Sequence, residues 1–124
     1  MDWEKEEIPN KDTLYRWVKK DQVDGDLVFP QAFKNLGQGM STDWSEYSTP
    51  EKTKNRVAKF GYNPKEYGVI SFVAGEVRKI EMQIVEHTPS KSSNNRAHTD
   101  VKGEKTTEIR VLFSRIYNWE IKTL

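Results

Sequence analysis

The chain contains no cysteine, so packing and hydrogen bonding alone must hold a fold of 124 residues together. Without thiols it has no disulfide, no thiolate metal ligand and no cysteine nucleophile, and it lacks the framework of most small secreted domains. Four Trp, five Tyr and five Phe supply the bulky apolar groups that disordered chains usually lack. Because domains most often run to about 100–150 residues, we expect one folded domain with one core.

The charges nearly cancel, with 20 Lys and Arg against 19 Asp and Glu, so the chain lacks the overall basic field of a strongly basic nucleic-acid-binding protein. We expect the polar, acidic residues 1–12 to be a lead-in to a single domain over residues 13–124. An acidic start is unlike the basic start of a signal peptide, and no apolar run approaches the about 20 residues that cross a bilayer. The expectation is a cytoplasmic protein with no membrane partner.

Short β-rich segments predict a sheet. Residues 13–18 alternate, with Leu14, Arg16 and Val18 on one side, and residues 69–73 are β-branched and aromatic. Residues 80–85 also alternate, with the apolar side chains at 80, 82 and 84 expected to face inward.

Two further segments predict helices. The sequence Ser48-Thr49-Pro50-Glu51 has a hydroxyl N-cap followed by proline, and we expect its helix to run to about Phe60 and to stop at Gly61. Val57 and Phe60, three residues apart, should lie on its buried face. Apolar residues over 106–119 have the spacing of a second helix, with a long twisted strand as the alternative.

The predicted class is therefore α+β, a small mixed or antiparallel sheet packed against one or two helices. The side chains expected to be buried are Leu14, Val69, Phe72, Ile84, Leu112 and Ile116.

The two histidines flank residues 88–95, a stretch rich in Ser and Asn that we expect to be an exposed loop. Two histidines without cysteine are too few nitrogen and sulfur ligands for the usual four-coordinate zinc site, so we expect no metal. Phosphate-loop, dinucleotide-binding and serine-hydrolase motifs are missing, and we expect no cofactor.

The densest run of polar side chains follows that loop, over residues 94–103. Arg96, His98 and Lys102 are our candidates for contacting an anionic partner, either a nucleic acid, a nucleotide or an acidic protein surface. A small binding module is the preferred interpretation, because a binding surface needs no catalytic motif.

A small enzyme is the alternative, and it needs His98, Asp100 and Arg16 to converge in one pocket. Its chemistry would be nucleotide-processing or similar to that of ADP-ribosyltransferase-like folds. There an arginine holds phosphates and a late glutamate stabilises positive charge. The residues with that order are Arg16, then Ser41 or Ser71, then Glu120.

Aromatic residues next to basic ones present another pair of alternatives. They form either a stacking surface for single-stranded nucleic acid or ordinary core packing. The aromatic set is Trp44, Tyr47, Tyr62 and Tyr67, and the basic set is Lys52, Lys54, Arg56 and Lys59.

The segment Asn95-Arg96-Ala97-His98, followed by Val101-Lys102-Gly103-Glu104-Lys105, resembles the Asn-x-Ala-His-x-x-Val-x-Gly-x-Lys pattern of a group of small uncharacterised bacterial proteins. Those proteins also have an early Leu-Tyr-Arg segment, an anchoring Phe and a Ser-containing segment, matched here by Leu14-Tyr15-Arg16, Phe33 and Met40-Ser41-Thr42. The resemblance spans about residues 13–120 and departs in having Arg96 where Pro is usual. It implies no established activity.

Overall fold

A six-stranded sheet organises the protein in the computed structural model, which describes residues 3–123. The strand order is β6-β7-β4-β1-β5-β8, and every pairing in it is antiparallel. The strands are β1 Thr13–Lys19, β4 Met40–Trp44, β5 Tyr67–Val73, β6 Ile84–His87, β7 His98–Lys102 and β8 Asn118–Ile121. The expected α+β class is confirmed.

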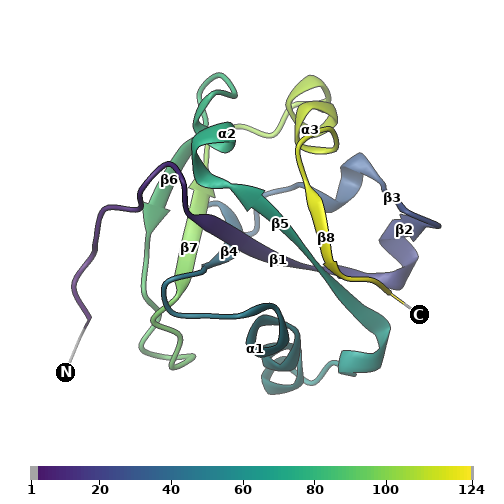
Figure 1. Ribbon diagram of the computed structural model, residues 1–124, viewed down its shortest axis with the longest axis horizontal. Coiled ribbons are helices and arrows are strands. Elements are labelled where there is room, and N and C mark those ends of the chain that lie inside the picture. Colours follow the sequence, from purple (N-terminus) through teal and green to yellow (C-terminus); the bar gives the residue numbers. More distant parts are fainter. Residues whose placement is uncertain (1–2, 124) are drawn as a thin grey trace.

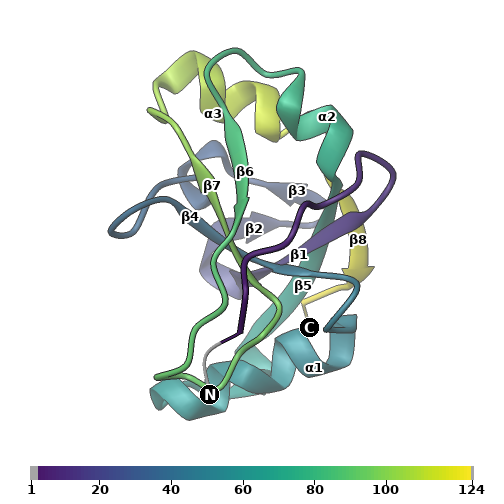
Figure 2. The ribbon, with the colours of Figure 1, turned by 90° about the vertical axis from the view of Figure 1, so that its left-hand side faces the viewer.

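Three short helices flank the sheet. In two perpendicular views α1 lies on one side of the central strands, and α2 and α3 lie on the other (Figures 1 and 2). They span α1 Pro50–Asn55, α2 Ala74–Arg78 and α3 Thr107–Phe113. The strands β2 Val23–Asp24 and β3 Leu27–Val28 form a separate two-stranded ribbon, and 3-10 turns cover Lys20–Gln22, Pro30–Ala32, Arg56–Phe60 and Pro64–Glu66.

Local sequence explains the first strand and the first helix. Leu14 and Val18 are fully buried, as the alternation predicted, and β1 pairs with both β4 and β5. Helix α1 begins where predicted, because the Thr49 hydroxyl accepts a hydrogen bond from the Lys52 amide at 3.2 Å and proline follows the cap. The 3-10 turn that continues it ends at Gly61, whose φ of 84° is left-handed.

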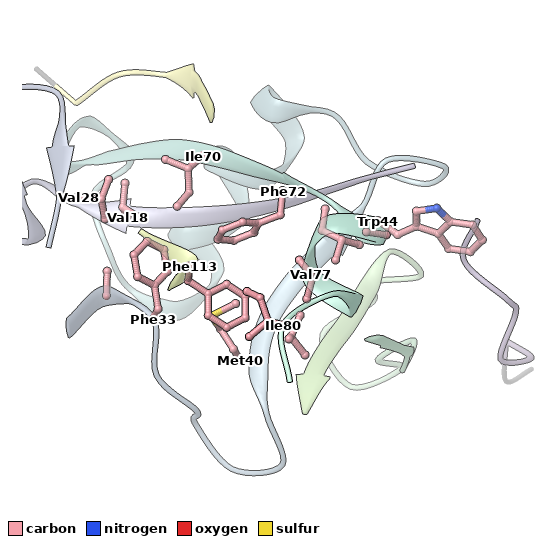
Figure 3. Packing of buried hydrophobic residues seen from close by; sticks show 14 of the residues in the cluster. Val18, Val28, Phe33, Met40, Trp44, Ile70, Phe72, Val77, Ile80 and Phe113 are labelled. Carbon is pink, nitrogen blue, oxygen red and sulfur yellow. The ribbon is translucent and has the colours of Figure 1, made fainter. Parts of the chain in front are cut away.

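The main core lies on the sheet face covered by α2 and α3. Rings of Phe33, Phe72 and Phe113 have centroids 5.5–6.0 Å apart, and Figure 3 shows Met40 beside them. All four side chains are fully buried. This packing leaves the opposite face, toward α1, for a smaller apolar layer and for polar groups.

The prediction for residues 80–85 was wrong in its strand limits and in the facing of Met82 and Ile84, whereas Ile80 is buried in the core as expected. Strand β6 covers Ile84–His87, and the chain turns before it, with Met82 at a φ of 65°. Met82 and Ile84 are 74% and 62% exposed, whereas Gln83 is buried. Side chains of β6 do alternate between the two faces of the sheet. Pairing of β6 with β7 puts Val85 opposite the buried Val101, so the odd-numbered residues of β6 face inward and the even-numbered ones face outward.

The single element predicted over residues 106–119 is two elements. Helix α3 ends at Phe113, and the chain then turns into β8, which pairs with the otherwise open edge of β5. Leu112, expected to be buried, is 39% exposed, and Ile116 is partly buried. The helical spacing was correct for the first half, while sheet pairing overrode it in the second.

Residues 3–12 contain no helix or strand, yet they pack against the domain. Ile8 is buried in the core, and Asp12 accepts a hydrogen bond from the Trp44 indole at 2.9 Å. The predicted lead-in therefore adds to the core of the domain it precedes. Met1 and Asp2, its first two residues, lie outside the described part of the chain.

No helix within residues 3–123 has the length and apolar character needed to cross a membrane.

Candidate functional site

A cavity of about 600 Å³ opens on the sheet face that carries α1. Its walls come from β1 and β4, from the 3-10 turn after α1 and from the loop that joins β6 to β7. In both ribbon views this loop lies beside the α1 segment (Figures 1 and 2). The volume falls within the about 300–1,000 Å³ typical of small-molecule sites.

Strand register gathers the polar side chains of this face. His98 on β7 is opposite Asp43 on β4, and Asp100 is opposite Ser41. Because residues two apart on a strand share a face, these four side chains lie on one face of two neighbouring strands. Ser41 and His98 are therefore diagonal neighbours, 57 residues apart in sequence.

The cavity is lined by more basic than acidic side chains. The basic residues are Arg16, Lys19, Lys34, Arg56 and Lys59, and the acidic ones are Asp21 and Asp43. Arg56 is paired with Asp43 at 3.1 Å. Within residues 3–123, no carboxylate lies within ion-pair distance of Arg16, Lys34 or Lys59. The cavity therefore has a surplus of positive charge.

Arg16 is held by backbone carbonyl groups. Its guanidinium donates to the carbonyl oxygen of Ala32 from Nε at 3.3 Å and from Nη2 at 2.8 Å, and to that of Ser41 from Nη1 at 2.7 Å. Burial lowers the pKa of Arg16 to about 10, so the side chain is still charged at neutral pH. Removing a cation from water without a carboxylate partner is costly, and an anion in the cavity would offset that cost.

One wall of the cavity is aromatic. The rings of Trp17 and Phe60 have centroids 5.5 Å apart, and those of Trp17 and Tyr67 are 6.2 Å apart. Phe60 is 53% exposed, so its expected place on the buried face of the helix was wrong. Its exposed ring instead extends the cavity wall, which suits stacking against a planar group.

Asp43, on β4, connects this strand to α1, to the 3-10 turn after α1 and to the loop between β6 and β7. Its Oδ2 accepts from the Thr53 hydroxyl at 2.8 Å and from Arg56 Nε at 3.1 Å, and its Oδ1 accepts from the Asn95 amide at 2.8 Å. The carboxylate is only 4% exposed. All its bonds are to protein donors, so Asp43 holds the site together.

The hydrogen bonds of His98 determine where its proton lies. Its Nδ1 is 2.9 Å from the carbonyl oxygen of Thr88 and 3.0 Å from the hydroxyl oxygen of the same residue. A carbonyl can only accept, whereas a hydroxyl can accept as well as donate, so a hydrogen on Nδ1 satisfies both contacts. Nε2 of the neutral ring is then an acceptor, and Ser41 Oγ lies 3.3 Å from it. Asp100 Oδ1 is 3.9 Å from the same nitrogen, beyond hydrogen-bond distance.

The residues predicted as a catalytic set are thus partly brought together. Arg16 and His98 both line the cavity, and Asp100 lies beside His98 without lining it.

The predicted anion-contacting set is dispersed. His98 lines the cavity, but Lys102 donates to both carboxylate oxygens of Glu86 at 3.0 Å. Arg96 lies 4.2 Å from the ring centroid of Tyr47 and 3.7 Å from a carboxylate oxygen of Glu6. Both cations therefore have partners outside the cavity.

The arginine, serine and glutamate set is also divided. Ser41 shares the cavity with Arg16, whereas Ser71 donates to Glu120 at 2.9 Å and neither of these two residues lines the cavity.

The predicted aromatic and basic sets divide in the same way. Tyr67, Arg56 and Lys59 line the cavity, while Trp44 and Tyr47 pack against the buried ring of His87. No group of three or more potential metal-ligating side chains occurs among the residues that the structure describes.

Sequence reasoning missed Trp17 and Asp43 as site residues. Trp17 belongs to the alternating pattern of β1, and nothing in the neighbouring sequence indicates that its side chain lines a cavity. Asp43 follows Ser41 at the two-residue spacing of one strand face, which was a usable signal.

The pattern around His98 has a structural reason at most of its positions. The Asn95 side chain accepts from the amide of Ala97 at 3.0 Å while donating to Asp43, and Ala97 is fully buried. Gly103 has a φ of 120°, and Lys105 donates to its carbonyl at 2.7 Å. These residues therefore shape the chain on both sides of His98.

No protein-family model, curated protein or solved structure matches this chain.

Proposed function

We propose that the protein binds a small anionic ligand of the nucleotide class, a phosphorylated molecule with a planar base, in the cavity beside α1. The observation that carries this proposal is the juxtaposition of an aromatic wall with cations that have no carboxylate partner among residues 3–123, around one cavity of about 600 Å³. Cations attract phosphate, and aromatic rings stack on bases.

The basic residues are placed for different tasks. Arg16 is fixed by three hydrogen bonds and offers a rigid charge, whereas Lys34 and Lys59 are exposed at the walls. A rigid guanidinium suits bidentate recognition of phosphate, and flexible lysines act as point charges that also steer the ligand.

The proposal keeps the anionic partner expected from the sequence and moves its contacts. His98 stays at the site, while Lys34 and Lys59 replace Arg96 and Lys102, which have protein partners elsewhere. A concave cavity favours a small ligand over a polymer. The cytoplasm remains the proposed compartment, because the chain has no cysteine.

Isothermal titration calorimetry with nucleoside mono-, di- and triphosphates, the matching nucleosides and inorganic phosphate tests this proposal. We expect a nucleotide to bind more tightly than its nucleoside, and affinity to fall as salt is raised. The double variant Lys34→Gln/Lys59→Gln should weaken binding about tenfold or more, since charged hydrogen bonds contribute about 1.5–3 kcal/mol each.

Lys79→Gln is the matched control, because Lys79 is an exposed lysine directly after α2, the helix on the far side of the sheet from α1, and its ammonium pairs with Glu76. Trp17→Leu should remove the preference for a nucleotide over inorganic phosphate. Failure of all nucleotides to bind, or equal weakening by Lys79→Gln, would contradict the proposal.

A further inference from the structure

We propose that Ser41 is a nucleophile activated by His98, so that the cavity transfers a phosphoryl group from its ligand to water. This inference deepens the proposed function, since it names a reaction for the same cavity. It rests on the geometry of the pair and on the charge around it.

The hydrogen bonds of His98 direct its acceptor nitrogen toward Ser41. Because the Thr88 carbonyl holds the hydrogen of His98 on Nδ1, the lone pair of Nε2 faces the Ser41 hydroxyl at 3.3 Å. A hydroxyl, a base within reach and a third group that orients the base are the features of an activated nucleophile. The backbone carbonyl of Thr88 takes the place that a carboxylate occupies in the familiar triads.

Ser41 is both held in place and accessible from the cavity. Arg16 Nη1 donates to the Ser41 carbonyl at 2.7 Å, and β4 is paired with β7 at this position. Ser41 and His98 both line the cavity, so a bound ligand can reach the hydroxyl. A nucleophile on a paired strand is held more precisely than one on a mobile loop.

Charged side chains surround Ser41 and His98. Arg16, Lys34 and Lys59 stabilise the negative charge on the equatorial oxygens of a transferring phosphoryl group. Asp100, 3.9 Å from Nε2, stabilises the imidazolium that forms when His98 accepts a proton. Charge of each sign therefore lies near the place where the opposite charge develops.

The reaction needs no reactant other than the bound ligand and water. Ser41 Oγ bonds to phosphorus while its proton moves to His98 Nε2, and the bond from phosphorus to the leaving oxygen breaks. The leaving oxygen then takes the proton from His98. Water next attacks the phosphoserine, gives a proton to His98 and releases phosphate, and that proton returns to Ser41.

A fluorophosphonate probe tests the nucleophile directly, because attack by serine expels fluoride and leaves a stable phosphonyl adduct. We expect intact-mass and peptide analysis to find one adduct, on Ser41, and Ser41→Ala to abolish it. His98→Gln should slow labelling about 100-fold or more, the lower range for a general base. Labelling should also fall at acidic pH, because a protonated imidazole has no lone pair at Nε2.

Ser92→Ala is the control, since Ser92 is an exposed serine of the neighbouring loop that does not line the cavity. It should label like the parent. An adduct on another serine, or equal labelling of the parent and His98→Gln, would overturn the inference and leave Ser41 and His98 as a structural hydrogen bond.

A second variant tests the same inference even if Ser41→Ala fails to fold. The chain lacks cysteine, so Ser41→Cys introduces a single thiol whose alkylation by iodoacetamide reports on His98. We expect it to react at least about tenfold faster than the thiol of Ser92→Cys, and His98→Gln to remove the difference. Equal rates would count against the inference.

Nucleotide titration separates this inference from the proposed function. Binding that survives in Ser41→Ala, without any adduct on Ser41 in the parent, refutes the nucleophile and keeps the binding site. If Ser41 forms an adduct but the protein binds no nucleotide, the proposed nucleotide ligand is refuted and the assignment of Ser41 as a nucleophile stands.

Discussion

Arg16 and Ser41 are joined where two central strands part. The pairing of β1 with β4 covers Leu14 with Trp44 and Tyr15 with Asp43, and beyond it the Arg16 guanidinium donates to the Ser41 carbonyl at 2.7 Å. The side chain thus supplies a bond that a continued ladder would have made. It opens the sheet at the cavity without leaving that carbonyl unpaired.

We expect Arg16→Met to lower the free energy of unfolding by about 1–3 kcal/mol, because the carbonyl groups of Ala32 and Ser41 lose their donors. Urea unfolding measures this loss. Arg78→Met is the control, since Arg78 bonds only to Asn10 among described side chains and should cost less than about 0.5 kcal/mol. Equal losses in both variants would mean that the bonds to the two carbonyls add nothing.

In their neutral forms the two histidine rings should carry their hydrogens on opposite nitrogens. His98 carries its hydrogen on Nδ1, whereas His87 Nε2 lies 2.7 Å from the carbonyl of Arg96 and His87 Nδ1 accepts from the amide of Glu6 at 3.0 Å. Long-range ¹H–¹⁵N NMR spectra distinguish the two tautomers. Matching tautomers would contradict the hydrogen bonding, and a hydrogen on Nε2 of His98 would remove the base from Ser41.

Core packing predicts that two large apolar residues, Phe33 and Leu112, contribute very differently to the free energy of unfolding. Phe33→Ala should cost about 3–5 kcal/mol, because Phe33 is fully buried and contacts the rings of Phe72 and Phe113. Leu112→Ala should cost about 1 kcal/mol or less, since Leu112 is 39% exposed. Chemical denaturation measures both, and similar losses would contradict the placement of Leu112 outside the core.

Lys105 should make stability depend on pH in the alkaline range. Burial, and secondarily the charge of Arg16, lower the pKa of Lys105 to about 8, compared with about 10.4 in an unfolded chain. Between these values the unfolded chain binds more protons than the folded one, so the free energy of unfolding should rise from pH 8 to pH 10.

Urea titrations at several pH values follow this rise, and Lys105→Met should flatten it. Lys79→Met, at an exposed lysine whose ammonium pairs with Glu76, should leave it unchanged. A parent protein whose stability is flat or falls from pH 8 to pH 10 would refute the prediction.

Local chemistry in the sequence was enough for the class of fold and for several elements. Strand β1 follows from its alternation, and α1 from its hydroxyl cap, proline and closing glycine, because each signal acts through nearby backbone groups. Arg16 and His98 were recognisable as candidate site residues from side-chain chemistry alone. No local signal showed that Arg96 would form an ion pair with Glu6, or Lys102 with Glu86.

The tertiary structure decided register, facing and proximity. Pairing of β6 with β7 selected Val85 and His87 as inward residues over Met82 and Ile84, because shifting a strand by one residue exchanges its faces. The same sheet brought Ser41 next to His98 across 57 residues of sequence. Cross-strand distances depend on register and twist, which are set by burial over the whole sheet, so no window of the sequence contains them.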